Sequence, residues 1–468
     1  MAYKKKTPPT WVPQPKQVEA LVRDEFEILY GGARGGGKTD AGIAWLLYPV
    51  YDWMRAEKNS ELQKRLSRYR ALIIRKNADD LKDWIDRAQY LYSQMFGQFV
   101  QFTGKPAEIK FGENGPIFRT GHLKDENAYQ KYQGHEYQRI LIEELTQIPE
   151  LGNYLDLTSS CRSTIDIQPQ VFATTNPDGP GFWWVKDRFH IPEWPPQEPV
   201  VTKDEIAMPD GSKRETDRVF ISALLQDNPK LKDKDIGYDA RIASMGQERV
   251  KAWLLGYWGA PIIEGVIFND EIKRAQSEKR ITEVPYDSRY PVYTYWDIGR
   301  DATPIIFVQF VGHAIHIIDF YENSGKGFDH YAQVLRDKSR DLHYWYGQHF
   351  GPHDLMKTDM QNETIWQIAE KQNILFTIVP KAETMDGIEA ARIKFSRFKI
   401  DSQKCAEYLK RISAFRREWD DNTQTFRDKY VHDWASHAGT ATFYLGLQPD
   451  PVYSEIEPNF ELYKSNFG

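Results

Sequence analysis

The chain has 468 residues, of which 41% are hydrophobic and 27% charged, so it has a globular composition and a length that predicts two or three domains. Its 61 Lys and Arg and 67 Asp and Glu give a net charge of −6, which excludes a basic coat over the whole chain. The two cysteines exclude a disulfide framework, and no apolar run is long enough for a membrane span. We expect a protein of a reducing compartment without a membrane partner.

The first half alternates short apolar runs with helical patterns, which predicts an α/β domain with a mostly parallel sheet. The region 186–217 is rich in Pro and charge and reads either as a linker or as an excursion within one domain. We favour the excursion because a strand-like run follows it. The irregular region 259–288 is predicted to be a linker between domains 1–258 and 289–468. The expected strands of the first half are 26–30, 71–74, 140–142, 171–174 and 219–221.

The second half opens with three successive strand-like runs separated by short turns, at 292–298, 304–311 and 314–321. Short turns favour an antiparallel meander over parallel crossovers. Helical patterns at 328–345 and 362–371 and a strand at 374–379 follow. Strands first and helices afterwards predict a second domain with a mixed α/β layer.

The strongest motif runs from Gly32 to Thr39 and fits G-x-x-x-x-G-K-[ST], the Walker A loop. A strand precedes it and a helical run, 40–48, follows it. In such a loop, backbone N–H groups and the helix N-terminus bind phosphate, the lysine reaches the β- and γ-phosphates, and the hydroxyl ligates Mg²⁺. A glycine-rich turn that happens to end in Lys-Thr is the alternative. The predicted nucleotide-binding residues are Gly32, Ala33, Arg34, Gly35, Gly36, Gly37, Lys38 and Thr39.

An acidic partner for this loop follows the apolar run 140–142, where Glu143 and Glu144 stand in the place of a Walker B element. The first acid is predicted to hold Mg²⁺ and the second to activate the attacking water. The first position is usually Asp, so Glu143 is a departure. Two solvated glutamates at a strand end are the alternative.

Several weaker candidates surround this pair. The segment 174–177 ends a strand with polar residues that could sense the γ-phosphate, although a plain turn explains them equally well. Gln17 is a candidate for reading the adenine edge, although an exposed helical glutamine is the default interpretation. Arg34 and Arg162 are candidates for stabilising phosphate charge, and Arg139 for acting on a neighbouring subunit. For any one of these arginines, a surface role is the better explanation.

A second site is predicted from three acids, Asp297, Asp354 and Asp433, which lie far apart in the sequence. Asp297 follows an apolar strand, where an unpaired carboxylate is costly and a metal would offset the cost. Three converging acids could hold two divalent ions and cleave a phosphodiester. Each acid taken singly is better explained as a cap, a turn or a surface charge.

A basic stretch, 391–430, has eleven Lys and Arg against six Asp and Glu, a local charge of +5. Its aromatic residues interleave with the charges, as in a track for a DNA backbone. An amphipathic helix with a solvated face fits the same pattern equally well. The aromatic residues in question are Phe395, Phe398, Phe415 and Trp419.

Taken together, the order of these motifs resembles the large terminase subunit of tailed bacteriophages, over nearly the whole chain from Gln17 to about Leu445. The later motifs are weak singly, and their shared order makes the match specific. One departure is Thr440, where family members often carry Asp; Asp433 lies two helical turns earlier and is expected to replace it. The further segments that carry the resemblance are 133–137, 174–179, 227–229, 256–258, 296–299, 351–354, 386–388 and 432–437.

The resemblance implies an ASCE-type P-loop ATPase domain and a ribonuclease H-like nuclease domain. It implies a motor that uses ATP and Mg²⁺ to drive double-stranded DNA into a procapsid, and an endonuclease that uses Mg²⁺ or Mn²⁺ to cut concatemeric DNA. The implied partners are a portal protein and a small terminase subunit, with a ring of copies on the procapsid or a monomer in isolation. The implied place is the host cytoplasm, outside the mature virion. The residues carried over are Lys38, Thr39, Glu143, Glu144, Asp297 and Asp354.

Two other functions remain open from the sequence. One is an ATP-driven DNA motor whose second domain grips DNA without cutting it. The other is a helicase-like or repair ATPase. Metal-dependent cleavage of plasmid DNA separates the first from a terminase, and strand displacement on a forked duplex identifies the second.

Overall fold

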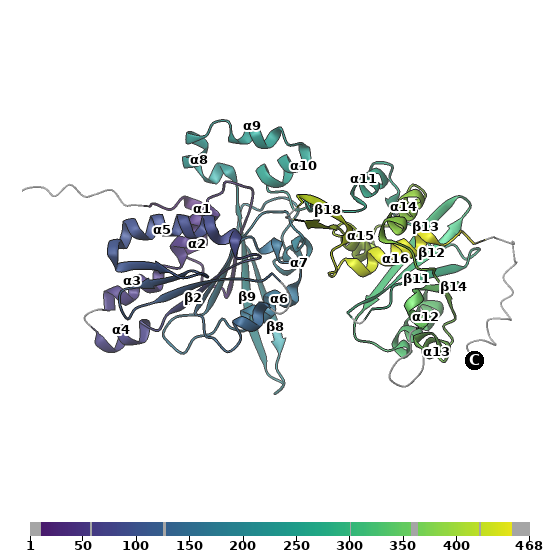
Figure 1. Ribbon diagram of the computed structural model, residues 1–468, viewed down its shortest axis with the longest axis horizontal. Helices are drawn as coiled ribbons and strands as arrows, with labels where there is room; N and C mark the ends of the chain where they lie inside the picture. The colour runs from purple at the N-terminus through teal and green to yellow at the C-terminus, as the bar shows by residue number, and fades with distance from the viewer. Residues whose placement is uncertain are drawn as a thin grey trace, which may run out of the picture. The chain divides into compact units, whose positions relative to one another are not determined.

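The computed structural model describes residues 11–56, 59–124, 128–299, 301–356, 364–420 and 423–451. The chain divides into two compact units, Met1–Ile262 and Ile263–Gly468. Each unit is a mixed α/β body built around its own sheet, as expected from the sequence (Figure 1). Within the described residues, no helix combines the length and apolar character that crossing a bilayer requires.

The first unit contains a nine-stranded sheet in the order β3-β4-β5-β2-β6-β7-β1-β9-β8. The run from β5 to β9 is parallel, which confirms the predicted mostly parallel sheet, whereas β3, β4 and β8 pair antiparallel at the edges. Strand β7 lies between β1 and β6. The strands are β1 (Glu27–Gly32), β2 (Arg70–Arg75), β3 (Val100–Thr103), β4 (Glu108–Phe111), β5 (Ile117–His122), β6 (Arg139–Ile142), β7 (Gln170–Thr175), β8 (Val200–Ala207) and β9 (Lys213–Ala223).

Both faces of this sheet are covered, so its central strands are buried on both sides and read as continuous apolar runs. Helices α2, α3 and α5 cover one face, and α6 and α7 cover the other (Figure 1). The helices are α1 (Pro15–Leu21), α2 (Lys38–Trp45), α3 (Tyr48–Arg55), α4 (Ser60–Leu66), α5 (Lys82–Phe96), α6 (Leu151–Thr158), α7 (Phe182–Arg188), α8 (Pro229–Lys234), α9 (Tyr238–Ala243) and α10 (Gln247–Arg249).

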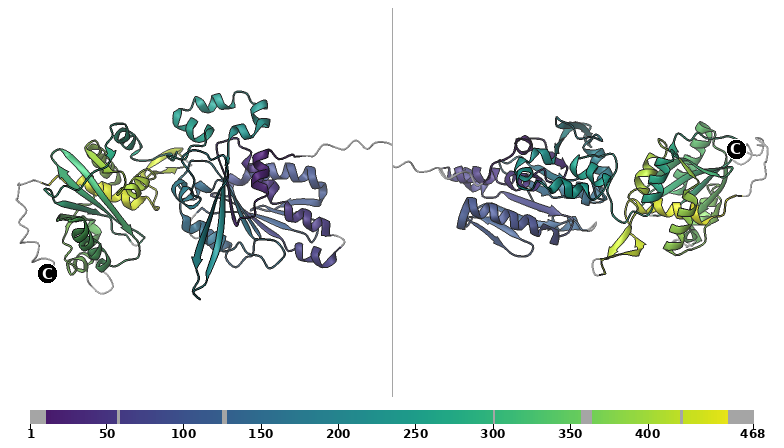
Figure 2. Two further views of the ribbon diagram at one scale, coloured as in Figure 1. Left: turned by 180° about the vertical axis from the view of Figure 1, so that it is seen from behind. Right: turned by 90° about the horizontal axis from the view of Figure 1, so that it is seen from above.

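The region 186–217 is an excursion within the first unit, as favoured from the sequence. Strands β8 and β9 form an antiparallel hairpin across Pro209-Asp210-Gly211, and the end of β9 pairs with β1. The free end of the hairpin extends beyond the helices of this unit (Figures 1 and 2).

A buried ion pair ties three elements of this unit together. The carboxylate of Glu27, 2% exposed on β1, accepts two hydrogen bonds from Arg188 at 2.6 and 2.8 Å and one from the Tyr154 hydroxyl at 2.7 Å. The three residues belong to β1, α7 and α6. The pair therefore fixes both helices against the strand that leads into the phosphate loop.

Glu27→Ala should lower the free energy of unfolding of the first unit by about 3–5 kcal/mol, because it leaves the Arg188 guanidinium buried without its partner. Asp52→Ala is the matched control, since its pair with Arg55 is solvent-exposed and 3.6 Å long, and it should cost less than about 1 kcal/mol. Urea unfolding followed by tryptophan fluorescence measures both. Equal effects of the two substitutions would contradict the assigned role of Glu27.

The second unit contains a seven-stranded mixed sheet in the order β10-β16-β13-β12-β11-β14-β15. Strands β11, β12 and β13 form the predicted antiparallel meander, and β14 pairs parallel with β11. The strands are β10 (Ile281–Thr282), β11 (Val292–Trp296), β12 (Thr303–Val311), β13 (Ala314–Asn323), β14 (Tyr346–Gly351), β15 (Phe376–Ile378) and β16 (Phe398–Asp401). Two further strands, β17 (Arg417–Asp420) and β18 (Thr425–Tyr430), form a hairpin that stands away from this sheet (Figure 2).

Two apolar cores lie on opposite faces of this sheet. Residues of α11, α14, α15 and α16 pack in one core, and residues of α12 and α13 in the other (Figure 1). The expected helix 362–371 begins at residue 365; residues 362 and 363 lie outside the described residues. The helices are α11 (Asn269–Ser277), α12 (Phe328–Leu342), α13 (Ile365–Glu370), α14 (Thr384–Phe395), α15 (Ala406–Ile412) and α16 (Ser436–Leu447).

The expected linker 259–288 is largely folded into the second unit. Ile267, Phe268 and Ile272 are buried in its core, and β10 pairs with β16. The prediction erred because Pro and Gly marked turns between short elements rather than a free connection. The division between the units falls after Ile262.

Candidate nucleotide site and carboxylate site

The phosphate loop joins the carboxyl end of β1 to the N-terminus of α2, the context that the motif requires. Gly35 and Gly37 have φ angles of 81° and 74°, which β-carbons disfavour and glycine adopts freely. The Ala33 N–H donates to the Ala223 carbonyl at 2.8 Å and the Arg34 N–H donates to the Trp253 carbonyl at 2.7 Å. The loop is thus anchored to β9 and to the segment after α10 before it turns into the helix.

Side chains also hold the loop through its carbonyl groups. The Lys38 ammonium donates to the Ala33 carbonyl at 2.5 Å, and the Asn228 amide donates to the Gly35 carbonyl at 2.7 Å. Loop carbonyls that face protein donors leave the loop's backbone N–H groups, other than those of Ala33 and Arg34, as its anion-binding groups. Burial lowers the pKa of Lys38 to about 8, although Asp178, Glu143 and Glu144 oppose the shift.

Gln17 supports the loop instead of presenting a free amide. Its Nε2 donates to the Gly37 carbonyl at 2.7 Å, its Oε1 accepts from the Gln14 N–H at 2.7 Å, and the residue is 3% exposed. The expected contact with an adenine edge would require these bonds to open. Gln17 also lines the pocket that opens at Gly37, so it lies close to the predicted nucleotide site.

The acidic strand end lies next to the loop, although more than a hundred residues separate them in sequence. The Thr39 hydroxyl donates to Glu143 Oε2 at 3.3 Å, and the other oxygen, Oε1, is buried without a hydrogen-bond partner among the described residues. A half-buried hydroxyl and a buried carboxylate with a spare oxygen match the hard oxygen donors that Mg²⁺ prefers. The site therefore fits the magnesium ion that the motifs imply.

Glu144 is placed at the end of the same strand in a left-handed backbone conformation, with φ 56° and ψ 59°. This conformation is costly for a residue with a side chain and is often found at functional sites. The carboxylate of Glu144 is paired with Arg75 at 2.6 Å, and its N–H donates to the Thr174 hydroxyl at 3.2 Å. Sequence reasoning missed Arg75, although its place at the carboxyl end of the neighbouring parallel strand β2 was a usable signal.

Arg34, which was predicted to stabilise phosphate charge, contacts an aromatic ring and a carboxylate of this unit. Its guanidinium lies 3.5 Å from the ring centroid of Trp253 and 3.7 Å from Asp178, which also accepts from the Trp253 indole at 2.9 Å. Burial raises the pKa of Asp178, while the Arg34 charge opposes the shift. Sequence reasoning missed the roles of Asp178 and Trp253, because only folding brings them to the loop.

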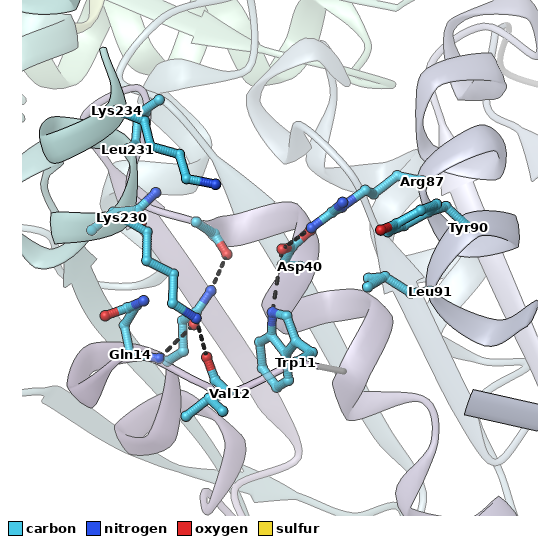
Figure 3. A pocket seen from close by; sticks show the side chains of 13 residues that line it. Trp11, Val12, Gln14, Asp40, Arg87, Tyr90, Leu91, Lys230, Leu231 and Lys234 are labelled. Carbon is cyan, nitrogen blue, oxygen red and sulfur yellow. Dashed lines mark hydrogen bonds and ion pairs between the residues drawn. The ribbon is translucent and has the colours of Figure 1, made fainter. Parts of the chain in front are cut away.

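A pocket of about 470 Å³ opens beside the phosphate loop at Gly37 (Figure 3). Asp40, on the first turn of α2, accepts from the Trp11 indole at 3.2 Å and from Arg87 at 2.7 and 2.8 Å. Lys230 donates to the Val12 carbonyl at 3.1 Å on the opposite side. The pocket therefore combines an aromatic ring with basic side chains directly next to the phosphate loop.

The electrostatics of Glu143 predict a pH dependence. Burial, reinforced by Glu144, raises the pKa of Glu143 from 4.5 to about 7. Below pH 7 the metal-free carboxyl is protonated, and Mg²⁺ binding must release that proton. The apparent affinity for Mg²⁺ with a non-hydrolysable ATP analogue should therefore rise about tenfold per pH unit up to about pH 7 and level off above.

Calorimetry in two buffers with different ionisation enthalpies measures this proton release. Glu143→Gln has no proton to release and should remove the buffer dependence. Glu113→Gln, an exposed acid in the same unit, should leave it unchanged. Binding without proton release in the unsubstituted protein at pH 6 would contradict the burial effect.

The second candidate site lies at the carboxyl ends of two adjacent parallel strands. Asp297 follows β11 and Asp354 lies just beyond β14, and the register pairs Tyr295 with Phe350. Parallel neighbours end at the same sheet edge, so the two acids are brought to one side of the sheet. Burial first, and then the charges of Asp297 and Asp354, raise the pKa of Tyr444 well above its ordinary value. Both carboxylates thus act on one hydroxyl of α16.

Two carboxylates at one sheet edge are donors that suit Mg²⁺ or Mn²⁺. The Asp297 carboxylate is bonded to His437 Nδ1 at 2.9 Å, and Asp354 lies 3.0 Å from His353 Nε2. Burial lowers the pKa of His437, but the hydrogen bond to Asp297 and the negative charges of Asp297, Glu322 and Asp301 together outweigh it, so the net shift of this pKa is upward. Sequence reasoning did not assign a role to His437.

The carboxylate of Asp433, the expected third acid, is paired with an arginine. Its carboxylate accepts from Arg416 at 2.6 Å and from the Ala435 N–H at 3.0 Å, and its side chain is 6% exposed. Thr440 does not replace it, since its hydroxyl donates to the Ser436 carbonyl at 3.0 Å. Helical spacing placed Asp433 near Thr440 in sequence, but it precedes α16 and folds against Arg416.

Other expectations also changed with the fold. Arg139 donates to the Trp45 carbonyl at 2.6 Å with its guanidinium 4.3 Å from the Trp45 ring centroid, so it is packed inward rather than presented to a neighbouring subunit. Arg162 donates to the Gly134 carbonyl at 3.3 Å. In the basic stretch, three of the four aromatic residues belong to the core with 0% exposure, and Trp419 alone of the four is exposed, at 46%; the core residues are Phe395, Phe398 and Phe415.

The fold and the first site define a P-loop α/β protein joined to a second mixed α/β unit with carboxylates at a sheet edge. No known protein-family profile matches the chain, and no curated protein matches it. Large terminases are among the solved structures that are similar to it.

Three of these structures illustrate the likeness. The large terminase of a thermophilic bacteriophage, solved in complex with ADP, is 17% identical, with a TM-score of 0.39, over 92% of this chain and 98% of that one. The HK97 bacteriophage large terminase is 10% identical, with a TM-score of 0.42, over 92% and 95%. The nuclease domain of the bacteriophage SPP1 large terminase with bound Mn is 14% identical, with a TM-score of 0.27, over 35% and 92%.

Proposed function

We propose that this protein is the ATP-driven motor subunit of a viral DNA-packaging machine, with an ATPase in the first unit and a metal-dependent DNA endonuclease in the second. The observation that carries the proposal is the contact between the Walker A loop and the acidic strand end, where the Thr39 hydroxyl meets Glu143 at 3.3 Å. The motif order, which resembles large terminases, gives the substrate: double-stranded DNA translocated into a procapsid in the host cytoplasm.

ATP hydrolysis is assigned to the loop and the acidic pair. Lys38 would leave the Ala33 carbonyl for the phosphates, and Thr39 and Glu143 would hold Mg²⁺, which neutralises phosphate charge. Glu144 would accept a proton from the water whose oxygen attacks the γ-phosphorus, releasing ADP and phosphate. Because Glu144 is paired with Arg75 at 2.6 Å, this carboxylate must exchange its partner before it can act as the base.

The pocket beside Gly37 supports a place for the base and ribose of the nucleotide. Its walls offer the Trp11 ring and the positive charges of Lys230 and Lys234, whereas Arg87 is paired with Asp40. An aromatic ring and cations suit a purine and its phosphates. The pocket is continuous with the loop at Gly37, so the whole nucleotide would lie within one unit.

DNA cutting is assigned to Asp297 and Asp354, which would hold Mg²⁺ or Mn²⁺ at the edge of the second sheet. A metal ion there would stabilise the charge that develops on the phosphodiester. Asp433 is left out of this set because Arg416 neutralises it. The proposed partners follow from the motif order: a portal protein, a small terminase subunit and further copies of this chain in a ring.

Glu144→Gln should keep ATP bound while lowering the turnover number about 10²–10⁴-fold, because the amide cannot accept the proton. Filter binding of labelled ATP and phosphate release measure the two properties separately. Glu113→Gln removes an exposed acid of the same unit and should leave turnover unchanged. The assay includes DNA and procapsids, so that neighbouring subunits can complete the site. Normal turnover in Glu144→Gln would show that Glu144 is not the general base.

A further inference from the structure

A second cavity of the first unit, of about 230 Å³, lies at the amino ends of β2 and β5. It is lined by Arg70 and Ile117, the first residues of these two strands, and by the residues just before β2. Strands β1, β2 and β5 run in the same direction, and the phosphate loop follows the carboxyl end of β1. The cavity therefore lies at the end of the sheet opposite to the proposed nucleotide site, and the proposed function does not use it.

The pairing of the strands places two cationic residues on one face of the sheet. Ile117 of β5 pairs with Arg70 of β2 on one side and with Lys110 of β4 on the other. Paired residues of neighbouring strands point to the same face, and two strand spacings amount to about 10 Å. Arg70 and Lys110 therefore extend on the same side of the sheet, and both line the cavity.

Hydrogen bonds to the backbone hold the Arg70 guanidinium in place. Its Nη1 donates to the Ser67 carbonyl at 2.9 Å and to the Tyr69 carbonyl at 2.8 Å. The Arg70 N–H donates to the Gln138 amide oxygen at 2.8 Å. Both side-chain bonds come from one nitrogen, which leaves Nε and Nη2 of the same planar group as donors. Because the group is already ordered, binding a ligand to it costs little further entropy.

The positive charges around the cavity are incompletely neutralised. Within the described part of the chain, neither Arg68 nor Arg70 forms an ion pair with a carboxylate. Lys110 shares the Glu108 carboxylate with Arg119 of β5, at 3.0 and 3.1 Å. One carboxylate thus serves two of the four cations, and the other two are left without a counter-ion.

This excess of charge acts on Arg70. Burial lowers the pKa of Arg70, and the positive charges of Arg119 and Arg68 lower it further, whereas Glu108 opposes the shift. A half-buried charge without a counter-ion is costly, and an anion bound beside it would offset the cost.

The residues that line the cavity select the class of anion. A guanidinium matches the oxygens of a phosphate in two parallel hydrogen bonds, and an ammonium adds a point charge. Among the lining residues Glu113 alone is acidic, and it lies in the exposed turn 112–115. No aromatic ring belongs to the set that lines the cavity in the described chain, so it offers no stacking surface for a nucleobase. The cavity therefore suits a phosphate group rather than a whole nucleotide.

We propose that Arg68, Arg70 and Lys110 form a second phosphate-binding site of the first unit, separate from the phosphate loop. The site goes beyond the proposed function because it requires no ATP hydrolysis. The bound group is a free phosphate or a phosphate of a DNA backbone, and both present the same oxygens to the three cations.

Binding of inorganic phosphate to the full chain tests the site. Phosphorus-31 nuclear magnetic resonance should show line broadening that saturates as phosphate is added. Arg68→Gln and Arg70→Gln should each raise the dissociation constant at least about tenfold, because each removes charge-assisted hydrogen bonds. Arg55→Gln removes an exposed arginine of α3 in the same unit and should leave the dissociation constant unchanged. Equal broadening in Arg68→Gln, Arg70→Gln and Arg55→Gln would mean unspecific surface binding and would overturn the proposal.

Two controls keep the result specific. Arg68 is exposed, so Arg68→Gln should fold even if Arg70→Gln disturbs the start of β2, and thermal unfolding checks both. The titration is repeated in Lys38→Ala, whose phosphate loop is impaired. The effect of Arg68→Gln should persist there, whereas its disappearance would place the phosphate at the loop and refute the second site.

A short DNA duplex identifies the source of the phosphate. If the DNA backbone supplies it, the duplex should displace inorganic phosphate, and Arg70→Gln should weaken duplex binding and flatten its salt dependence. If the ligand is free phosphate, the broadening should persist at saturating duplex. A chain that keeps this phosphate but never hydrolyses ATP would refute the proposed function alone. A chain that hydrolyses ATP without any phosphate sensitive to Arg68→Gln would refute the site alone.

Discussion

Lys38→Ala should abolish ATP hydrolysis, with a loss of at least about 10²–10³-fold in the turnover number, the usual cost of removing one preorganised donor to developing charge. Lys38 is half-buried, and its ammonium donates to the Ala33 carbonyl at 2.5 Å, so it is held inside the loop that would receive the phosphates. The alanine also removes a loop anchor, so ATP binding should weaken as well. Phosphate release and filter binding measure the two effects.

Two variants make the Lys38 result specific. Lys64→Ala removes an exposed lysine on α4 of the same unit and should hydrolyse ATP at the normal rate. Lys38→Arg keeps the charge but changes the shape, and it should remain strongly impaired because arginine does not replace the compact ammonium. Thermal unfolding of each variant checks that the first unit is intact. Normal turnover in folded Lys38→Ala would remove the basis of the motor proposal.

Asp297→Ala should abolish metal-dependent cleavage of plasmid DNA and leave ATP hydrolysis unchanged. Loss of a metal ligand removes several kcal/mol of charge stabilisation, which corresponds to about 10³-fold or more in rate. Asp297→Asn should be equally inactive while keeping a hydrogen bond with His437. Plasmid nicking with Mg²⁺ and with Mn²⁺ is the measurement, and phosphate release is the parallel readout.

The matched control for Asp297 is Asp341→Ala, an exposed acid on α12 paired with Arg340 at the surface. It should cut DNA at the normal rate. If the unsubstituted protein cuts no DNA with either metal, that result would support the alternative function, a motor whose second unit only grips DNA. Cleavage by Asp297→Ala at the normal rate would contradict the assignment of the sheet edge as the cutting site.

The elements of both units were largely predictable because they depend on local pattern. The phosphate loop needs a strand before it, glycines at positive φ and a helix after it, and all three are contiguous in sequence. The meander 292–323 was predictable for a similar reason, since short turns force neighbouring strands to pair. The linker prediction failed where local pattern is ambiguous: turns around α11 and β10 look like a free connection until Phe268 is buried in the core.

Sequence-based prediction of the acids also succeeded for some residues and failed for others. Asp297 and Asp354 were identified from their strand ends, and the parallel pairing of β11 with β14 brings them to one edge. Asp433 was also placed in the set, but its burial against Arg416 depends on a residue that no spacing rule connects to it. His437 was not assigned, because its importance depends on a hydrogen bond to a residue 140 positions away.

The amino-acid order alone determined which residues could bind phosphate and which strand ends carry acids, because backbone geometry and side-chain chemistry act over a few neighbouring positions. Tertiary structure alone decided which charges meet. It paired Glu144 with Arg75, neutralised Asp433 with Arg416, and gathered Arg68, Arg70 and Lys110 around one cavity. Electrostatic and hydrogen-bond energies depend on distance in space, and distance in space follows from the packing of whole sheets and helices.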